Sequence, residues 1–329
     1  MDKLLPTFLR IVGVFLLIVG LVGAYYAPLE IYVLYLFSEG GRFHYDGFGV
    51  GSFWFATLVV MNLGYYLIAA VCLPLAVGHI RLRCWSLTLA QLYTWFWLGA
   101  GILLVANSIL LLPSVFRLDL ERGIIITRVI LVGVSSLIAL VFLPLLGLWF
   151  YKSDKVRSVF VAHDPNLYWT ERYPFPLLAV LLLFIISIIV LHIAMFFQAM
   201  FPMFGRILLG RQSVYIIAMC ILISLILIYG IVQLKTLAWW GSLVYVSLLT
   251  ISTVMSFAGY SFYDVVEIMK LPAYEMELID KMALIHDYPL VGLALPPLLI
   301  AFGLIIYSKR YFGKDNRLQI AAEVNGRTI

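Results

Sequence analysis

The chain has 329 residues, of which 64% are hydrophobic and 12% are charged, with a net charge of +5. An ordinary soluble domain is about 45–50% apolar and about 25% charged, so this composition excludes one and indicates a multi-pass membrane protein. The basic residues lie in short loops rather than in one long run. No nucleic-acid partner is therefore expected, and the lipid bilayer is the expected surrounding.

Eight apolar stretches are each long enough to cross a bilayer, which takes about 20 mostly apolar residues in a helix. They cover residues 8–28, 52–77, 86–112, 124–150, 175–198, 213–233, 237–259 and 289–308. Such long, continuous runs do not fit barrel strands, so they predict an all-α polytopic transmembrane helix bundle. We expect one integral membrane domain over residues 1–329, ending in a polar tail at residues 309–329.

The first span has two interpretations. Lys3 and Arg10 before the apolar run Ile11–Ala24 are also typical of a cleavable signal peptide, which would leave seven spans. We favour an uncleaved span, because the apolar stretch continues to Pro28. Small residues also lie near one face of this helix, as packing in lipid favours: Gly13, Gly20, Gly23 and Ala24.

The basic residues indicate how the chain crosses the membrane. Fourteen of the 22 lysine and arginine residues fall on the side that holds both termini, against six of the 17 acidic residues. By the positive-inside rule, that side is cytoplasmic. We therefore expect a plasma (inner) membrane protein with both termini in the cytoplasm.

Two short turns with similar sequences suggest that the chain has two halves. Each has a glycine, a leucine four residues later and then a cation, from Gly78 to Arg83 and from Gly230 to Lys235. Four spans separate the turns, so two four-helix halves would form a parallel repeat. A true duplication and a chance similarity between apolar hairpins both explain so short a match.

Three loops are long enough to fold. Residues 30–51 form an aromatic-rich outer loop, and residues 152–173 form the main cytoplasmic loop. In the outer loop at residues 261–288, apolar residues at three-residue spacing predict a short amphipathic helix on the membrane surface. These residues are Met276, Ile279, Met282 and Ile285.

Polar side chains within the spans are the candidate functional residues. The densest set shares one face of the seventh span and consists of Ser247, Thr250, Thr253 and Ser256. This face would line a polar path or pocket, or its hydroxyls would bond to their own helix or to a neighbouring one; the second interpretation is favoured. The remaining candidates are Asn62, Asn107 and His192. We expect His192 to bond to a neighbouring helix rather than to ligate haem, because no other span offers a second histidine.

Two outer loops carry acidic and histidine side chains that would in principle assemble a divalent-metal site. They are Glu39, His44 and Asp46 in the first loop, and Asp264, Glu267, His286 and Asp287 in the last. Their spacing matches no diagnostic ligand pattern, so two solvated acidic loops are the better explanation. No metal, cofactor or catalytic residue is predicted.

The sequence contains no phosphate-binding loop, dinucleotide fingerprint, zinc-protease motif or nucleophile elbow. The span centres carry no obvious charge, which argues against proton-coupled transport. We expect a non-enzymatic structural, regulatory or assembly component, for which another membrane protein would be the partner. The alternative is a transporter or flippase for a neutral or lipid-like solute, and a membrane-surface metalloenzyme is the third hypothesis.

Overall fold

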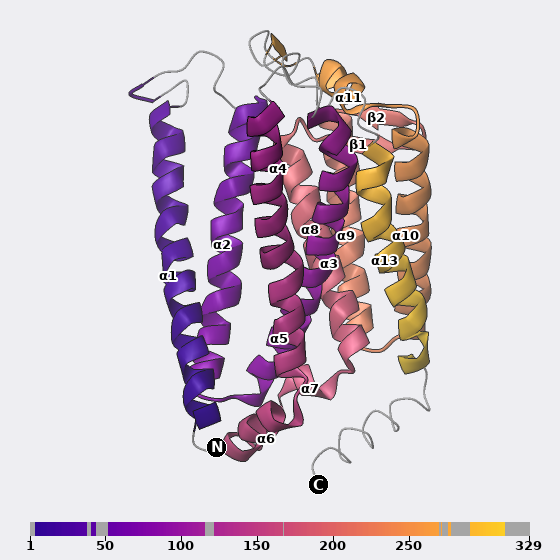
Figure 1. Ribbon diagram of the computed structural model, residues 1–329. Coiled ribbons are helices and arrows are strands. Elements are labelled where there is room, and N and C mark those ends of the chain that lie inside the picture. The colour runs from indigo at the N-terminus through magenta and orange to yellow at the C-terminus, as the bar shows by residue number, and fades with distance from the viewer. Residues whose placement is uncertain are drawn as a thin grey trace. The chain divides into compact units, whose positions relative to one another are not determined.

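The computed structural model describes residues 4–37, 41–43, 52–115, 122–166, 168–269, 271, 276–277 and 290–312 (Figure 1). Helices dominate these ranges, and eight of them are long and apolar enough to cross a membrane. The predicted all-α bundle with eight spans is confirmed.

The spans follow the predicted stretches closely. They are α1 (Leu4–Phe37), α2 (Phe53–Ile80), α3 (Cys84–Val115), a fourth span made of α4 (Arg122–Leu137), the π-helix η1 (Ile138–Phe142) and α5 (Leu143–Tyr151), then α8 (Phe175–Phe196), α9 (Arg211–Val232), α10 (Thr236–Phe257) and α13 (Leu290–Ser308). The main difference is that α1 runs beyond residue 28 to Phe37. The helix continues through Pro28, which ends the predicted stretch, and residues 29–37 include no further glycine or proline.

Several short elements outside the spans were not expected from the sequence. They are α6 (Asp154–His163), α7 (Trp169–Arg172), the antiparallel hairpin of β1 (Phe201–Met203) and β2 (Arg206–Leu208), α11 (Phe262–Met269) and the 3-10 turn η2 (Lys309–Tyr311). In α6, Val156 and Phe160 are four residues apart and both buried, which makes this helix amphipathic. The amphipathic helix predicted around Met276–Ile285 and the tail after Phe312 lie almost wholly outside the described residues.

The chain forms two compact units. Unit 1 consists of Met1–Phe96 and Pro144–Phe175, and unit 2 consists of Trp97–Leu143 and Pro176–Ile329. The boundaries fall inside α3 and inside the fourth span rather than between two successive halves of the sequence. The single-domain organisation and the duplication both stay predictions.

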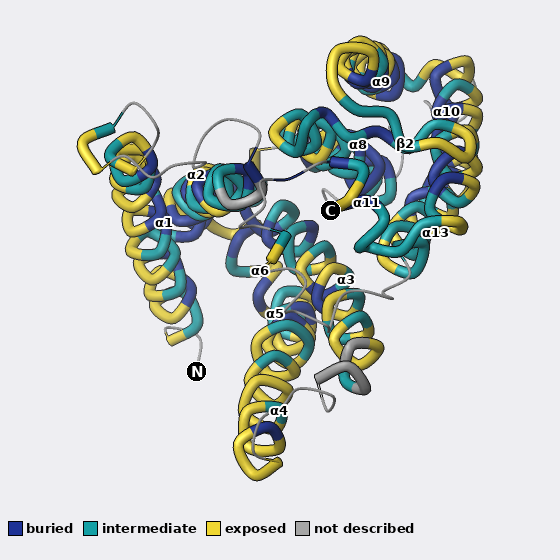
Figure 2. Tube along the Cα trace, turned by 90° about the horizontal axis from the view of Figure 1, so that it is seen from above, coloured by how far each residue is buried: buried dark blue, intermediate teal, exposed yellow. Residues whose placement is uncertain are grey.

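In unit 1, glycines allow α1 and α2 to approach closely. Gly13, Gly20 and Gly23 are buried on α1. A Cβ on Gly20 would lie 2.7 Å from the Leu73 side chain, and one on Gly23 would lie 2.9 Å from the carbonyl oxygen of Tyr65. The small-residue face expected on the first span is therefore the face that contacts α2, and Figure 2 shows the buried stripe along α1.

A buried apolar cluster joins α1, the turn between α2 and α3, and α6 within unit 1. Its members are Leu9, Leu82, Leu87, Val156 and Phe160. Because Val156 and Phe160 come from α6, the main loop between the fourth and fifth spans is packed onto the helix ends.

In unit 2, α10 is bonded to both α9 and α13. The indole nitrogen of Trp239 donates to the carbonyl oxygen of Ile305 on α13 at 2.7 Å. The Tyr245 hydroxyl donates to the carbonyl oxygen of Cys220 on α9 at 3.3 Å and lies 3.2 Å from the Ser224 hydroxyl. These bonds satisfy polar groups that would otherwise face hydrocarbon.

The two similar turns have the same backbone geometry. Arg83 N donates to Gly78 O at 2.8 Å, and Lys235 N donates to Gly230 O at 3.0 Å. Leu82 and Leu234 both have a φ of 52°, the left-handed conformation that closes a Schellman motif. In each turn, a Cβ on the glycine would overlap the side chain eight residues later, in the next helix. The sequence similarity therefore reflects one way of ending a helix and starting the next.

Most residues of the helix α4 are exposed. Ile125 is its single buried residue, and exposed residues, many of them large and apolar by identity, run along its length (Figure 2). The π-helical segment η1 follows α4. Here α3 approaches the backbone closely, because a Cβ on Gly101 of α3 would overlap the carbonyl oxygen of Leu140 in η1.

Candidate functional site

Four of the seven polar candidates bond to a carbonyl of their own helix. The pairs are Ser247 Oγ with Leu243 O at 2.7 Å, Thr250 Oγ1 with Val246 O at 2.8 Å, Asn107 Nδ2 with Leu103 O at 2.8 Å and His192 Nδ1 with Ile188 O at 2.8 Å. The sequence predicts a bond from His192 to a neighbouring helix. His192 is instead exposed on α8, and its Nδ1 bonds to the carbonyl oxygen one turn back in the same helix. Such bonds satisfy polar side chains within the bilayer without forming a site.

Asn62 is the candidate that joins two helices in unit 1. Its Nδ2 donates to the carbonyl oxygen of Ala27 on α1 at 2.5 Å, and its side chain is buried. An amide bonded across two helices in the bilayer stabilises their contact. Asn62 therefore belongs to the α1–α2 contact.

Two serines one turn apart on α10 hold the β1–β2 hairpin. Ser252 Oγ donates to Pro202 O at 2.8 Å and accepts from Phe204 N at 3.0 Å. Ser256 Oγ donates to Arg206 O at 3.2 Å and accepts from Gly205 N at 3.1 Å. Ser256 belongs to the hydroxyl face expected from the sequence, whereas the strands that the two serines bond were not expected.

The hairpin turn itself had a sequence signal. Phe204 and Gly205 both have positive φ, 40° and 88°, as the two central residues of a type I′ turn require. A glycine between two short apolar runs is typical of such hairpins. The strands are only three residues long, which is too short for an alternating pattern to predict them.

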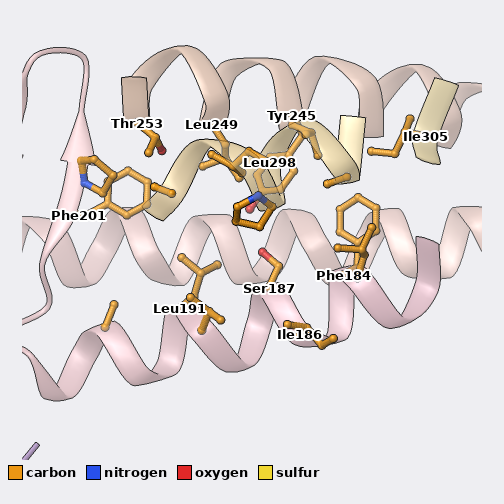
Figure 3. A pocket seen from close by; sticks show the side chains of 18 of the residues that line it. Phe184, Ile186, Ser187, Leu191, Phe201, Tyr245, Leu249, Thr253, Leu298 and Ile305 are labelled. Atoms are coloured by element: carbon orange, nitrogen blue, oxygen red, sulfur yellow. The ribbon is translucent and has the colours of Figure 1, made fainter. Parts of the chain in front are cut away.

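Unit 2 contains a cavity of about 400 Å³ between α8, α10 and α13, with β1 at one end. Figure 3 shows Phe184 and Leu191 on α8 facing Tyr245 and Leu249 on α10, with Leu298 of α13 between them. The lining is almost entirely hydrocarbon. Its volume lies within the range of about 300–1,000 Å³ that small-molecule sites occupy.

Few polar atoms reach this cavity. Ser187 of α8 and Thr253 of α10 contribute hydroxyls (Figure 3), whereas the hydroxyl of Tyr245 is bonded towards α9. Of the predicted hydroxyl face, Thr253 alone lines the cavity. Thr250 does not line it and bonds to the carbonyl oxygen of Val246 in its own helix. The cavity therefore suits an apolar molecule with at most a small polar group.

Two consecutive prolines shape the α13 wall. Pro296 and Pro297 lie inside the helix, and Pro297 lines the cavity. Neither has an N–H, so the carbonyl oxygens of Gly292 and Leu293 receive no helical hydrogen bond from them. Within a bilayer, such a break in the backbone ladder is tolerated where the helix lines a cavity or packs on protein.

His79 is a buried polar residue in unit 1 that the sequence analysis treated only as part of a basic turn. Its Nδ1 lies 2.8 Å from Leu75 O and its Nε2 lies 3.0 Å from the Tyr151 hydroxyl, so in the neutral tautomer Nδ1 donates to the carbonyl and Nε2 accepts from the hydroxyl. The rings of Tyr151 and Phe160 contact it edge to face. With both nitrogens bonded and no exposed surface, His79 links α2 to α5 rather than offering a site.

An ion pair joins the α2–α3 turn to the loop after α6. Arg83 Nη1 lies 3.3 Å from Asp164 Oδ1, and the Asn166 amide donates to the same oxygen at 2.9 Å. Burial by itself would raise the pKa of the Asp164 carboxyl. Hydrogen bonds from Tyr168 and Asn166, together with the positive charge of Arg83, outweigh burial and hold that pKa below its usual value.

The candidate metal ligands are not brought together in the part of the chain that the structure describes. No group of three histidine, cysteine or acidic side chains there could hold a metal ion. Asp264 is instead bonded to the backbone and side chain of Ser261 at the start of α11. Glu39, His44, Asp46, His286 and Asp287 lie outside the described residues.

The chain was compared with protein-family models, with curated proteins and with solved structures. None of the three comparisons finds a match.

Proposed function

We propose that the protein binds a lipid-like molecule in the unit 2 cavity and acts as a carrier for it within the membrane. The observation that carries this proposal is the hydrocarbon lining of a cavity large enough for a ligand. An apolar occupant of this cavity would make many dispersion contacts with its hydrocarbon lining.

The position of the cavity supports entry from the bilayer. Val190 of α8 and Pro297 of α13 both line the cavity and are both exposed. Exposed apolar side chains, including Ile185 and Leu299, flank them on the same two helices. A molecule dissolved in the bilayer would reach the cavity between α8 and α13 without crossing a polar surface.

Filling the cavity tests the binding step. Ala294→Phe places a ring into the cavity from α13, whereas Leu293→Phe changes the neighbouring exposed position and is the matched control. In native mass spectra of the full chain purified in mild detergent, we expect a bound lipid in the wild type and in the control, and its loss in Ala294→Phe. Equal lipid retention by all three proteins would refute the proposal.

The two threonines of α10 test the transport step. Thr253→Val removes a hydroxyl from the cavity wall, whereas Thr250→Val removes one that is bonded to its own helix. In reconstituted vesicles, we expect Thr253→Val to change lipid flux by about 2- to 10-fold, the effect of one net hydrogen bond, and Thr250→Val to leave flux unchanged. A wild-type flux no greater than that of protein-free vesicles would rule out the carrier function.

The exposed helix α4 favours a second candidate, the structural or assembly component expected from the sequence. Most residues of α4 are exposed, and many of them are large and apolar, a surface that a partner helix would cover. A second polypeptide at fixed stoichiometry in mass spectra of protein from its own membranes would support this function. A lone chain with bound lipid would support the carrier.

For the location, we propose the plasma (inner) membrane with both termini in the cytoplasm. The excess of lysine and arginine in the loops on the side of the termini supports this orientation. Trp239 and Trp240 at the start of α10, next to Lys235, agree with an interfacial position for that end of unit 2.

A further inference from the structure

A group of cations rests on aromatic rings at the end of unit 2 where α13 continues into η2. We call it the cation–aromatic cluster, and its members are Tyr229, Lys235, Trp239, Trp240, Tyr307, Lys309, Arg310 and Tyr311. Lys309 Nζ lies 5.4 Å from the ring centre of Trp239 and 5.9 Å from that of Trp240. Lys235 Nζ lies 5.4 Å from the ring centre of Tyr229. The rings fix the ammonium groups near the start of α10.

These two lysines retain binding capacity. Both are exposed, and neither forms an ion pair with an acidic residue of the described ranges. An ammonium group has three N–H donors, and an aromatic face does not saturate them. The cluster therefore attracts an anion with several acceptor oxygens.

The cluster is continuous with the cavity. Ile305 lines the cavity, and its carbonyl oxygen accepts the 2.7 Å bond from Trp239, whose ring carries Lys309. Lys309 follows Ile305 by four residues, about 6 Å along a helix. Figure 3 shows Ile305 at the end of the cavity opposite Thr253 and Phe201. A long molecule in the cavity would thus have one end beside the cations.

We infer that the ligand is an anionic phospholipid, with an acyl chain in the cavity and its phosphate held by Lys309 and Lys235. This inference rests on the proposed function and names the ligand class. The lining of α13 extends from Ala294 to Ile305, about 16 Å at the helical rise, which accommodates a large part of an acyl chain. The apolar wall of the cavity is complementary to an acyl chain, and the adjoining cations are complementary to an anionic headgroup.

The experiment compares phosphatidylglycerol with phosphatidylcholine of the same acyl chains. The full-length protein in neutral detergent is titrated with each lipid, and the bound fraction is read by native mass spectrometry. We expect the wild type to retain phosphatidylglycerol at least about tenfold better, because each lysine near an anionic headgroup contributes a severalfold gain. Lys235→Gln combined with Lys309→Gln removes this preference, and Lys309→Arg alone preserves it.

The control is Lys152→Gln, because Lys152 also rests on an indole, with Nζ 4.8 Å from the ring centre of Trp95, but belongs to unit 1. It should leave the preference unchanged. Equal retention of both lipids by the wild type, or a preference that survives the double substitution, would overturn the headgroup site while leaving lipid binding intact. Displacement of phosphatidylglycerol by inorganic phosphate at equal concentration would assign the site to free phosphate instead. If the wild type retains neither lipid, or Ala294→Phe retains both, the proposed function itself fails.

Discussion

At the scale of residues, burial separates two histidines that make the same local bond. His79 lies in the basic turn and His192 within the fifth span, and each bonds through Nδ1 to the carbonyl one turn back. Only His79 is fully buried, with Nε2 bonded to Tyr151. The burial and the bonding partners of a polar side chain depend on which helices pack beside it. The hydropathy of the sequence does not contain that information.

Asp164 gives a pH-dependent prediction at the same scale. Because its folded pKa is lowered, its contribution to stability is complete above the unfolded value of about 3.9 and is lost as the pH falls through the folded pKa. Asp164→Asn should cost about 1–3 kcal/mol at pH 7, since Arg83 and Asn166 lose a charged partner.

Thermal unfolding of the purified protein between pH 7 and pH 3 measures this effect. The difference between wild type and Asp164→Asn should shrink as the solution becomes acidic. Asp154→Asn, on the exposed first turn of α6, is the control and should change stability less. A difference that stays constant with pH would contradict the assigned role of the carboxylate.

At the scale of elements, the two Schellman turns differ in what surrounds the left-handed leucine. Leu82 is fully buried in the apolar cluster of unit 1, whereas Leu234 is partly exposed. Glycine relieves a left-handed strain of about 1–2 kcal/mol, and removing a buried leucine costs about 2–5 kcal/mol. Leu82→Gly should therefore destabilise the protein, and Leu234→Gly should be close to neutral.

Chemical or thermal unfolding of the two variants, each against the wild type, compares the turns directly. A similar loss in both variants would show that the leucine side chain matters equally at the two positions. In that case the burial difference between the turns would not explain their energetics.

The β1–β2 hairpin gives a second prediction at this scale. Removing both hydroxyls in Ser252→Ala with Ser256→Ala leaves the amides of Phe204 and Gly205 without their partners. Hydrogen exchange of the peptide that contains these amides should accelerate by about 10- to 100-fold, which corresponds to a loss of about 1.4–2.8 kcal/mol. Ser247→Ala, which removes a hydroxyl bonded within α10, should leave the exchange unchanged. Unaltered exchange in the double variant would mean that the β1–β2 hairpin is stable without bonds to the two serines.

At the scale of the whole molecule, the number of spans fixes which loops share a side of the membrane. With eight spans and cytoplasmic termini, Lys155 in α6 faces the cytoplasm and Arg206 in the hairpin faces outward. Both are exposed, so a cysteine at either position is accessible to a reagent on its own side.

Labelling with a membrane-impermeant maleimide tests this topology. In a background with the three native cysteines replaced, Arg206→Cys should react in intact cells and Lys155→Cys only after the membrane is opened. Labelling of Lys155→Cys in intact cells would reverse the orientation. Labelling of both would require an even number of spans between them.

The sequence by itself determined that this is a multi-pass membrane protein with eight spans. It also determined the glycine face of α1 and the shared form of the two basic turns. Each of these follows from hydropathy or from spacing within a few residues of chain, which are local quantities. It also marked the hydroxyls of α10 as unusual and favoured a structural role for them over a polar path or pocket.

Only the tertiary structure decided what those hydroxyls do. Ser252 and Ser256 bond strands about 50 positions away in the chain, Thr253 lines a cavity, and Thr250 bonds to its own helix. The cavity exists because α8, α10 and α13 leave a space between them, and a space between distant helices has no signature in any one of their sequences. The burial of His79 and the adjacency of Lys309 to the cavity have the same origin, since both depend on which helix ends meet.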